Sequence, residues 1–548
     1  MLEPTIGPVP SGDPLAQLQH TMAWLLTQAF ECAVGLAVGA LAARAMRSRG
    51  LHWSWAAVAL ISALLARTSL GGVGVVAIVA SATAARKGRR WHREDLEAGA
   101  DLAELARERR SPFDLALAFA RQALSRIRRG LPAERWLRAG RLAIGRDVHG
   151  DTVWVPFVGD GGHHTLVVGA TGSGKTVTQT WLAIRAIERG SGAIVVDPKG
   201  DHGMRAEIRQ AALAAGRTFL EWSPRGDTVY NPYARGSETE IADKVLAGER
   251  FTEPHYLRQA QRYIGHAVRA LRSSGVEVSL RGIVEQLDPQ RLELLARTLA
   301  ESSAEPTHAY LDSLTTRQRS DLAGVRDRLA ILAESDVGPW LDPQANTAAR
   351  IDLLEAAAAR AVVYLNLEAD SRPLLTQMLG AAIVQDLLTA VASLQGSPTP
   401  TLVVIDEFSA VAAEQVVRLF GRARSAGFSL LLGTQELSDL RLPGRERLLE
   451  QVMGNLSLLV AHRQVVPSSA ELIASTAGTQ GAWRLSRHSD GRTTRSRTRE
   501  GVLDPQRITG LAPGWAAVIS LAEGPAARIA RIFSPTSDAR AKEGHDAS

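Results

Sequence analysis

The sequence lacks the residues that usually cross-link a chain. Its 548 residues include a single cysteine, Cys32, which lies in an apolar stretch. A disulfide framework is therefore excluded, a zinc site built from cysteines is disfavoured, and we expect most of the chain to lie in a reducing compartment. Aromatic residues make up only 5% of the chain, whereas alanine, leucine and arginine are abundant, and this bias favours helices.

The composition otherwise has no extreme feature. Hydrophobic residues make up 45% and charged residues 22%, which excludes a disordered chain. No sequence repeat recurs at a spacing of 20–50 residues. At a typical size of ~150 residues per domain, the length predicts several domains. The net charge of +6 fits two explanations equally well: basic flanks of membrane segments, or a polyanionic partner such as nucleic acid.

Charge is nearly absent from residues 21–43, where Glu31 is the only charged residue. A helix of this length spans about 34 Å, enough to cross a bilayer core of ~30 Å. Residues 1–20 contain no Lys or Arg, so the stretch lacks the basic start of a cleaved signal peptide. Two further apolar stretches, 51–66 and 68–85, suit a tight hairpin of two short spans.

Basic clusters flank these stretches and predict their orientation. The positive-inside rule places both clusters in the cytoplasm. We therefore expect an extracytoplasmic tail at 1–20 and a multi-pass anchor of about three spans at 21–85, in the inner or plasma membrane. Two spans would need a cytoplasmic N-terminus or a re-entrant second segment, and buried helices of a soluble domain are a further alternative. The clusters are Arg44, Arg47 and Arg49, and Arg86, Lys87, Arg89, Arg90 and Arg93.

A basic connector follows at residues 86–150. It contains 16 Lys/Arg and 9 Asp/Glu, a net charge of +7. Attraction to anionic lipid head groups and direct contact with DNA explain this charge equally well. At the other end of the chain, we expect residues 536–548 to be disordered.

From about residue 142 the pattern changes, and short apolar runs typical of buried strands alternate with helical stretches. This alternation predicts an α/β fold, with a mainly parallel sheet covered by helices on both faces. Residues 240–349 read as helices throughout, so we expect a motor domain at 151–239 and 350–535 that is interrupted by an all-α insertion at 240–349. The runs are 152–157, 164–170, 192–197, 361–367, 401–408, 428–435 and 456–463.

The central motif fits the pattern G-x4-G-K-[ST] of a phosphate-binding loop. An apolar run precedes it and a helical stretch follows it, as this motif requires. Its glycines let backbone N–H groups surround phosphates, and the following helix adds the positive end of its dipole. We expect it to bind ATP with Mg²⁺, with the lysine contacting the β- and γ-phosphates and the threonine hydroxyl ligating the metal. The motif consists of Gly169, Ala170, Thr171, Gly172, Ser173, Gly174, Lys175 and Thr176.

Two acids follow the apolar run 402–405, at the carboxyl end of a predicted buried strand. Ligands of parallel α/β sheets bind at this edge. Asp406 is expected to hold Mg²⁺, and Glu407 to act as the general base for the attacking water. Gln435, after the run 428–434, is placed to sense the γ-phosphate or to position that water.

An arginine between these elements is a candidate for action on a neighbouring subunit. Arg424 lies in the stretch 421–427, and an arginine there could neutralise transition-state charge on the ATP of the next subunit. Arg422 is the second choice, and an ordinary surface arginine is the alternative.

Arginines alternate with serine and threonine near the C-terminal end, with Asp490 as the only acid among them. This pattern suits contact with phosphates of DNA without reading of bases. A solvated hairpin on the outside of the protein is the equal alternative. The arginines are Arg484, Arg487, Arg492, Arg495, Arg497 and Arg499.

The ordered set of motifs resembles the type IV coupling proteins, the conjugative DNA-transfer ATPases of the FtsK/HerA superfamily of RecA-like P-loop motors. The resemblance covers most of the chain after residue 140, and the membrane anchor matches as well. It rests on 163–176, the strand-end motif 197–201, Tyr230-Asn231-Pro232, the helical insertion, 403–408, 421–427, 433–435 and 502–519.

The resemblance implies a homo-hexamer with ATP bound between subunits. It also implies single-stranded DNA with an attached relaxase as cargo, and a cytoplasmic motor that faces a secretion channel of membrane proteins. The roles of Lys175, Thr176, Asp406, Glu407 and Gln435 carry over directly, and Arg424 resembles the family's trans-acting arginine. The short loops between the apolar stretches depart from the family, which commonly has two spans and a sizeable external loop.

The sequence leaves some alternative functions open and excludes others. A membrane ATPase that exports protein is the main alternative, because the sequence shows no cargo surface. A helicase or packaging motor is disfavoured by the membrane segments, and a nucleotide switch without hydrolysis is a further alternative. A dinucleotide oxidoreductase is excluded by Lys175-Thr176, which belong to triphosphate chemistry. An ABC exporter lacks support, because we find no ABC signature motif before residue 402.

Overall fold

The computed structural model describes most of the chain. The described residues are 14–48, 51–65, 67–97, 136–138, 140–148, 150–156, 161–249, 251, 253–344, 349–368, 372–411, 413–441, 447–487, 493–522 and 526–535. The chain divides into two compact units, residues 1–132 with 480–500, and residues 133–479 with 501–548. The termini 1–13 and 536–548, and most of the predicted connector, lie outside the described residues.

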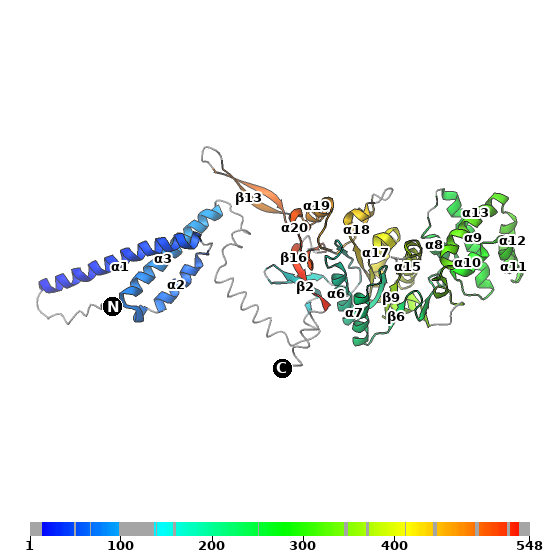
Figure 1. Cartoon of the computed structure of the whole chain (residues 1–548), viewed down its shortest axis with the longest axis horizontal. Coiled ribbons are helices and arrows are strands. Elements are labelled where there is room, and N and C mark those ends of the chain that lie inside the picture. The colour runs from blue at the N-terminus through cyan, green and yellow to red at the C-terminus, as the bar shows by residue number, and fades with distance from the viewer. Residues whose placement is uncertain are drawn as a thin grey trace. The chain divides into compact units, whose positions relative to one another are not determined.

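The described part of the first unit contains the helices α1 (Pro14–Ser48), α2 (Ser54–Leu65) and α3 (Arg67–Glu97). Helices α1 and α2 both pack on α3, and Figure 1 shows the three side by side. Glycine permits the close approach, since a Cβ on Gly39 would lie 2.4 Å from the Ala80 carbonyl oxygen. A Cβ on Gly72 would lie 2.3 Å from the Glu31 Oε1 atom, so the lone acid of α1 faces α3.

Helix α1 is long and apolar enough to cross a membrane, and only a small part of it is buried. Helix α15 (Pro373–Ser393) meets the same test, but it is mostly buried in the second unit and is a core helix. The 12 residues of α2 extend only ~18 Å, too short for a perpendicular span. The predicted three-span arrangement therefore stays a prediction. The connector assigned from residue 86 begins inside α3, which continues to Glu97.

Among its described residues, the second unit is built on one 12-stranded sheet of order β1-β2-β16-β15-β12-β4-β11-β10-β5-β9-β6, with β3 paired to β2. Strands β12 to β6 of this order run parallel, and the strands before them are antiparallel. This confirms the predicted α/β class with a mainly parallel sheet. The strands are β1 (Leu137–Arg138), β2 (Arg141–Asp147), β3 (Thr152–Pro156), β4 (Thr165–Val168), β5 (Gly192–Asp197), β6 (Phe219–Trp222), β9 (Val362–Asn366), β10 (Thr401–Ile405), β11 (Phe428–Thr434), β12 (Leu458–Ala461), β15 (Trp515–Ser520) and β16 (Ala526–Ile532).

Strands β1 and β2 differ from the expected domain limits. The sequence predicts a connector over residues 86–150, but β2 pairs with β16 and β3 within the motor sheet. Leu142 and Ile144 of β2 are fully buried. The reason is that alternating apolar residues need a covered face, and the antiparallel edge of the sheet supplies one. The motor sheet therefore begins near residue 137 rather than 151.

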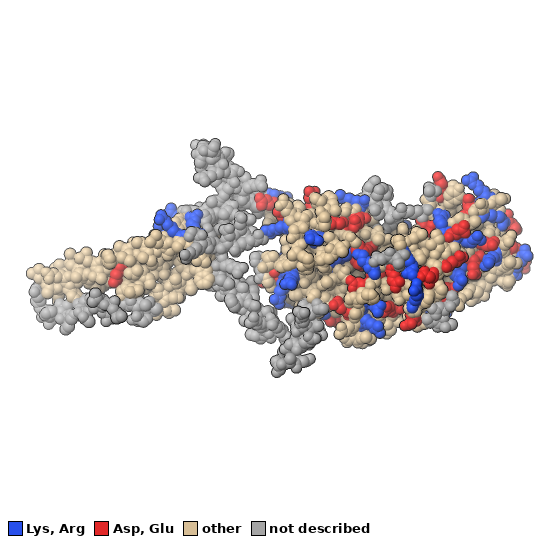
Figure 2. Space-filling view, viewed as in Figure 1, with Lys and Arg blue, Asp and Glu red and all other residues tan. Residues whose placement is uncertain are grey.

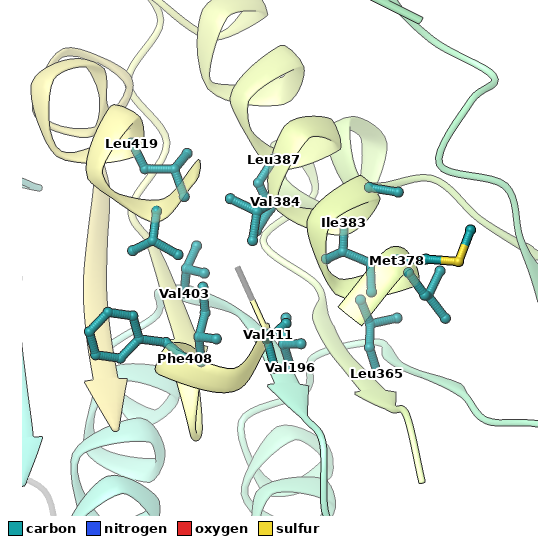
Figure 3. Close-up of a cluster of buried hydrophobic side chains, with 14 of the residues drawn as sticks. Val196, Leu365, Met378, Ile383, Val384, Leu387, Val403, Phe408, Val411 and Leu419 are labelled. Carbon is teal, nitrogen blue, oxygen red and sulfur yellow. The ribbon is translucent and has the colours of Figure 1, made fainter. Parts of the chain in front are cut away.

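Helices cover both faces of the sheet. On β10, Leu402 and Val404 belong to one buried cluster and Val403 and Ile405 to another, as expected for a strand whose side chains alternate. The first cluster includes residues of α6 (Lys175–Glu188) and α7 (His202–Ala214), and the second includes residues of α15, α16 (Phe408–Val411) and α17 (Ala413–Ala423). Figure 3 shows Leu387 of α15 above Val403, within the second cluster.

The insertion is helical, and Figure 1 shows its helices as one group. Its base is a small parallel pair, β7 (Thr228–Tyr230) with β8 (Ala349–Ile351). The helices are α8 (Glu238–Leu246), α9 (Pro254–Ser273), α10 (Leu280–Gln286), α11 (Pro289–Ala296), α12 (Glu301–Asp312), α13 (Thr316–Ala333) and η2 (Gly338–Trp340), followed by α14 (Leu353–Ala358) after β8. The remaining elements are η4 (Arg424–Ala426), η5 (Leu437–Leu440), α18 (Leu448–Gly454), α19 (Pro467–Thr476), β13 (Thr479–Arg487), β14 (Thr493–Gly501) and α20 (Pro505–Thr509).

A buried ion pair joins the insertion to the motor. Lys244 of α8 is 2% exposed, and its Nζ atom lies 2.7 Å from Asp386 Oδ1 of α15. The ammonium also donates to the carbonyl oxygens of Pro232 and Arg235, and the Tyr230 hydroxyl donates to Asp386 Oδ2 at 2.9 Å. All three ammonium protons therefore have partners, which a buried charge needs.

We expect Lys244→Met to lower the free energy of unfolding by ~3–5 kcal/mol, because it leaves the Asp386 carboxylate buried without its partner. Arg269→Met is the matched control, since the Arg269–Glu238 pair on the neighbouring helices is more than a third exposed and contributes at most ~1 kcal/mol. Urea unfolding of the full chain measures both. Equal losses in the two variants would contradict the prediction.

Candidate active site

The candidate site lies at the carboxyl edge of the parallel strands. The loop after β4 carries the phosphate-binding motif. Asp406 follows β10, Gln435 follows β11, and the 197–201 motif begins at the last residue of β5. Because these strands pair in parallel in the order β4-β11-β10-β5, their carboxyl ends meet at one edge. Four segments far apart in the sequence thus contribute to one site.

The phosphate-binding loop has the backbone shape that its glycines allow. Gly172 and Gly174 have φ of 75° and 110°, a region that disfavours side chains. Helix α6 begins at Lys175, and its N-cap, Gly174, provides no side-chain hydrogen bond to the first turn. Its first N–H groups can therefore bind phosphate oxygens. Thr176, the second residue of α6, is half-buried.

The two acids at the end of β10 are both buried. Lys175 Nζ forms an ion pair with Glu407 Oε1 and lies 3.7 Å from Asp406 Oδ1. Burial raises the pKa of Asp406, and the neighbouring Glu407 carboxylate adds to this rise. Burial also acts to raise the pKa of Glu407, but its hydrogen bonds to Lys175 and Lys199 outweigh burial and hold the pKa below 4.5. The pKa values of the two neighbouring acids are therefore shifted in opposite directions, and Glu407 is the stronger acid.

The surroundings of Asp406 fit a metal ion. Its Oδ1 atom is buried without a hydrogen-bond partner, and so are both polar atoms of the Gln179 amide on α6. A Cβ on Gly433 would lie 2.5 Å from Asp406 Oδ1 and 2.3 Å from Gln179 Nε2, so only glycine leaves room there. A buried carboxylate oxygen without a hydrogen-bond partner suits Mg²⁺, which takes oxygen ligands.

Three donors converge on one oxygen of Glu407. Besides Lys175, the Gln435 Nε2 atom lies 3.3 Å from Glu407 Oε1, and Lys199 Nζ lies 2.8 Å from it. Glu407 also has a φ of 45°, rare for a residue with a side chain. Such backbone strain often marks functional positions. The structure therefore brings the predicted Lys175, Asp406, Glu407 and Gln435 together.

Lys199 and His462 are the site residues that sequence reasoning missed. His462 follows β12, and its Nδ1–H donates to the Trp515 carbonyl oxygen at 3.0 Å. Its Nε2 then accepts from the Thr178 hydroxyl of α6 at 2.8 Å. Burial lowers the His462 pKa to about 4, so the ring is neutral. Its two hydrogen bonds connect α6, the helix that follows the phosphate-binding loop, to the sheet. The strand-end motif 197–201 was a signal for Lys199, but no local signal marked His462.

Arg424 lies at the amino ends of the parallel strands, opposite to the carboxyl ends that carry the candidate site. It begins η4, just before β11, and its exposed side chain packs on Gly162, where a Cβ would lie 2.5 Å from Arg424 Cγ. The seven residues of β11 place roughly 20 Å between this position and the carboxyl edge. Arg424 is therefore not part of the site in its own chain.

The predicted DNA-contacting arginines fall on a hairpin of β13 and β14. Arg484 and Arg487 lie on β13, and Arg495, Arg497 and Arg499 lie on β14. Arg499 is exposed, and Arg492 lies outside the described residues. Most of the hairpin belongs to the unit that also contains α1–α3, and not to the motor unit.

Comparison with known proteins agrees with this geometry. DotL, a type 4 coupling protein of Legionella pneumophila subsp. pneumophila, is 22% identical over 351 residues, which cover 52% of this chain and 45% of DotL. The chain thus matches about half the length of this curated relative.

Two solved structures share the fold. The bacterial conjugative coupling protein TrwBdeltaN70, in an unbound form, has a TM-score of 0.52 at 17% identity, over 73% of this chain and 90% of that chain. TrwB in complex with ADP and Mg²⁺ has a TM-score of 0.50 at 19% identity, over 68% and 85%. The family model described as the type IV secretion-system coupling protein DNA-binding domain matches residues 155–502, more than half of the sequence. The chain therefore belongs to the family of type IV secretion-system coupling proteins.

Proposed function

We propose that this protein is a membrane-anchored ATPase that transfers single-stranded DNA, with its attached relaxase, into a type IV secretion channel. The observation that carries the proposal is the convergence of Lys175, Asp406, Glu407 and Gln435 at the sheet edge of a coupling-protein fold. Helix α1 supplies an anchor long enough for a membrane. We infer a multi-pass anchor with α2 and α3, and a cytoplasmic motor.

The substrate of the site is ATP, and the metal is Mg²⁺, as in the TrwB complex with ADP and Mg²⁺. The 169–174 loop and the first turn of α6 bind the phosphates, and Lys175 contacts the β- and γ-phosphates. Thr176 and Asp406 would hold Mg²⁺, which would neutralise charge on the phosphates. Glu407 accepts a proton from the attacking water, whose oxygen bonds to the γ-phosphorus as the bond to ADP breaks.

The position of Arg424 supports an assembly of several copies. Because it lies at the sheet edge opposite to its own nucleotide site, it can reach a nucleotide only in a neighbouring subunit. We infer a ring, a homo-hexamer by family resemblance, in which Arg424 completes the site of the next subunit. Membrane proteins of the secretion channel are the partners of the anchored end.

The first test measures ATP hydrolysis by the full chain with and without single-stranded DNA, over a series of salt concentrations. We expect DNA to stimulate hydrolysis, and salt to weaken the stimulation, because phosphate contacts release counterions. Replacing Arg497 and Arg499 with glutamine should flatten the salt dependence if the hairpin contacts DNA. An unchanged slope would remove the hairpin from the contact surface.

Hydrolysis that is indifferent to DNA would overturn the DNA cargo and favour protein export by the same motor. Absence of hydrolysis under all conditions would overturn the ATPase assignment itself and leave a nucleotide switch.

A further inference from the structure

Lys199 is a second lysine at the catalytic carboxylate, and none of the motifs assigns it a role. It lies in the loop between β5 and α7, and its Nζ atom is 2.8 Å from Glu407 Oε1. The same oxygen also pairs with Lys175. Two ammonium groups thus hold the carboxylate that should accept the proton of water, and a carboxylate held in this way is a weak base.

Hydrogen bonds fix the backbone of the loop around Lys199, whereas its side chain is partly exposed. Asp197 Oδ1 accepts the backbone N–H groups of Lys199 at 2.9 Å and Gly200 at 3.0 Å, and Asp197 Oδ2 accepts that of Asp201 at 2.6 Å. The Lys199 side chain is 43% exposed, compared with 8% for Lys175. A fixed backbone with a long, partly exposed side chain allows the ammonium to change partners without moving the sheet.

We propose that Lys199 is a γ-phosphate-binding residue that leaves Glu407 when ATP enters the site. In the structure it restrains the base, and on ATP binding its ammonium moves to the more strongly charged γ-phosphate. Glu407 is thereby released for the attacking water only when a γ-phosphate is present. This inference rests on the proposed ATPase function and identifies which phosphate the residue recognises.

The test compares binding of a non-hydrolysable ATP analogue and of ADP to the full chain. Lys199→Met should weaken binding of the analogue ~10-fold, because a charge-assisted hydrogen bond contributes about this much. Binding of ADP should be unchanged, because ADP lacks the γ-phosphate. Lys199→Arg should restore most of the difference. Lys175→Met should weaken the binding of both nucleotides. Arg205→Met, which removes a nearby cation paired with Glu221, should weaken the binding of neither.

An equal loss for both nucleotides, or no loss for either, would overturn the role of Lys199. The result is independent of turnover, so a protein that binds nucleotides but does not hydrolyse ATP would refute the proposed function without deciding this inference.

A separate observation concerns the membrane unit by itself. A cavity of about 450 Å³ opens between α1, α2 and α3, because most of the side chains that line it are small. Ala42 of α1, Ala56 and Ala59 of α2, and Ala80 and Ala84 of α3 line it. The cavity is therefore lined mainly by apolar side chains and has the volume of a small ligand.

The ends of α1 and α3 that lie next to this cavity are strongly basic, and tryptophans lie beside them. Figure 2 shows these helices with a largely uncharged surface and Lys and Arg gathered at one end. The Arg47 guanidinium lies 5.2 Å and the Lys87 ammonium 6.0 Å from the Trp91 ring, and Arg89 lies 5.8 Å from the Trp53 ring. In residues 14–92, Glu31 is the only acid. An apolar cavity beneath a basic, tryptophan-lined rim complements an anionic phospholipid.

We infer that the cavity holds one acyl chain of an anionic phospholipid whose head group binds Arg47 and Lys87. Native mass spectrometry of the full chain in detergent tests this with phosphatidylglycerol and phosphatidylcholine of identical chains. Phosphatidylglycerol should bind more tightly. The double variant Arg47→Gln and Lys87→Gln should remove the preference for phosphatidylglycerol. Ala59→Phe, which fills the cavity, should weaken binding of phosphatidylglycerol ~10-fold.

Ala33→Phe is the matched control, because Ala33 is an exposed position on α1 outside the cavity. It should leave lipid binding unchanged. Equal binding of the two lipids would overturn the inference. So would wild-type binding by Ala59→Phe, which would mean that lipids gather only at the charged rim.

Discussion

Replacing Glu407 with glutamine is expected to abolish most ATP hydrolysis while leaving ATP bound. General-base catalysis contributes ~10²–10⁴-fold, and glutamine has the same shape but accepts no proton. Glutamine also cannot form the ion pairs with Lys175 and Lys199, so both lysines become available to phosphates and the affinity for ATP should not fall. Steady-state hydrolysis and nucleotide binding by the full chain measure the two effects.

Glu471→Gln is the matched control, since it makes the same substitution at an exposed carboxylate on α19, away from the donors to Glu407. It should change hydrolysis much less than Glu407→Gln. A Glu407→Gln variant that hydrolyses ATP at the wild-type rate would show that another group accepts the proton, and the assignment of the base would fail.

The same residue predicts the pH dependence of kcat/KM. The pKa of Glu407 lies below its ordinary value of 4.5, so the carboxylate stays ionised as the pH falls to that value, and activity is lost only below it. Since this carboxylate is ionised throughout the neutral range, it adds no change in rate between pH 6 and 8. His462, with a pKa of about 4, adds none there either.

Removing Arg424 is expected to reduce hydrolysis ~10³–10⁵-fold, as loss of an arginine finger does, without weakening nucleotide binding. The reason is its position: Arg424 lies at the sheet edge opposite to its own nucleotide site and is exposed there. An arginine so placed can stabilise transition-state charge only in an adjacent subunit. Hydrolysis by Arg424→Ala measures the loss, with Arg418→Ala on α17 as an exposed control.

Mixing two inactive variants gives the sharper test. In a ring that contains Arg424→Ala and Glu407→Gln subunits, some sites combine an intact Glu407 with an intact Arg424 from the neighbour, so activity should reappear. Failure to recover activity, although the two variants form mixed rings, would place the arginine in its own site or remove its role. Loss of activity in Arg422→Ala instead would transfer the role to Arg422.

Much of the nucleotide site was predictable because its main parts are short local patterns. The phosphate-binding loop is a run of contiguous residues whose glycines serve one backbone shape, and both positive φ angles occur where the motif requires them. Asp406 and Glu407 follow an apolar run, and parallel pairing then places them at the ligand edge. The same rule brought Gln435 to the site.

Some features escaped prediction because local patterns do not carry them. The first strands of the motor were assigned to the connector, because charged arginines dominate residues 86–150 and mask the short alternation in β2. The pairing of Lys244 with Asp386 joins residues 142 positions apart. Nothing near Lys244 in the sequence distinguishes it from a solvated lysine on an amphipathic helix.

The sequence alone therefore determined the α/β class, the apolar first helix, the nucleotide loop and the acids at the strand end, because each is a pattern of adjacent residues. The tertiary structure decided which other side chains reach the site. Lys199 meets Glu407 because β5 pairs with β10, His462 meets α6 because β12 pairs with β4, and Arg424 is excluded because it precedes its strand. Strand order and direction set these distances, and they depend on pairing between distant segments that no local pattern records.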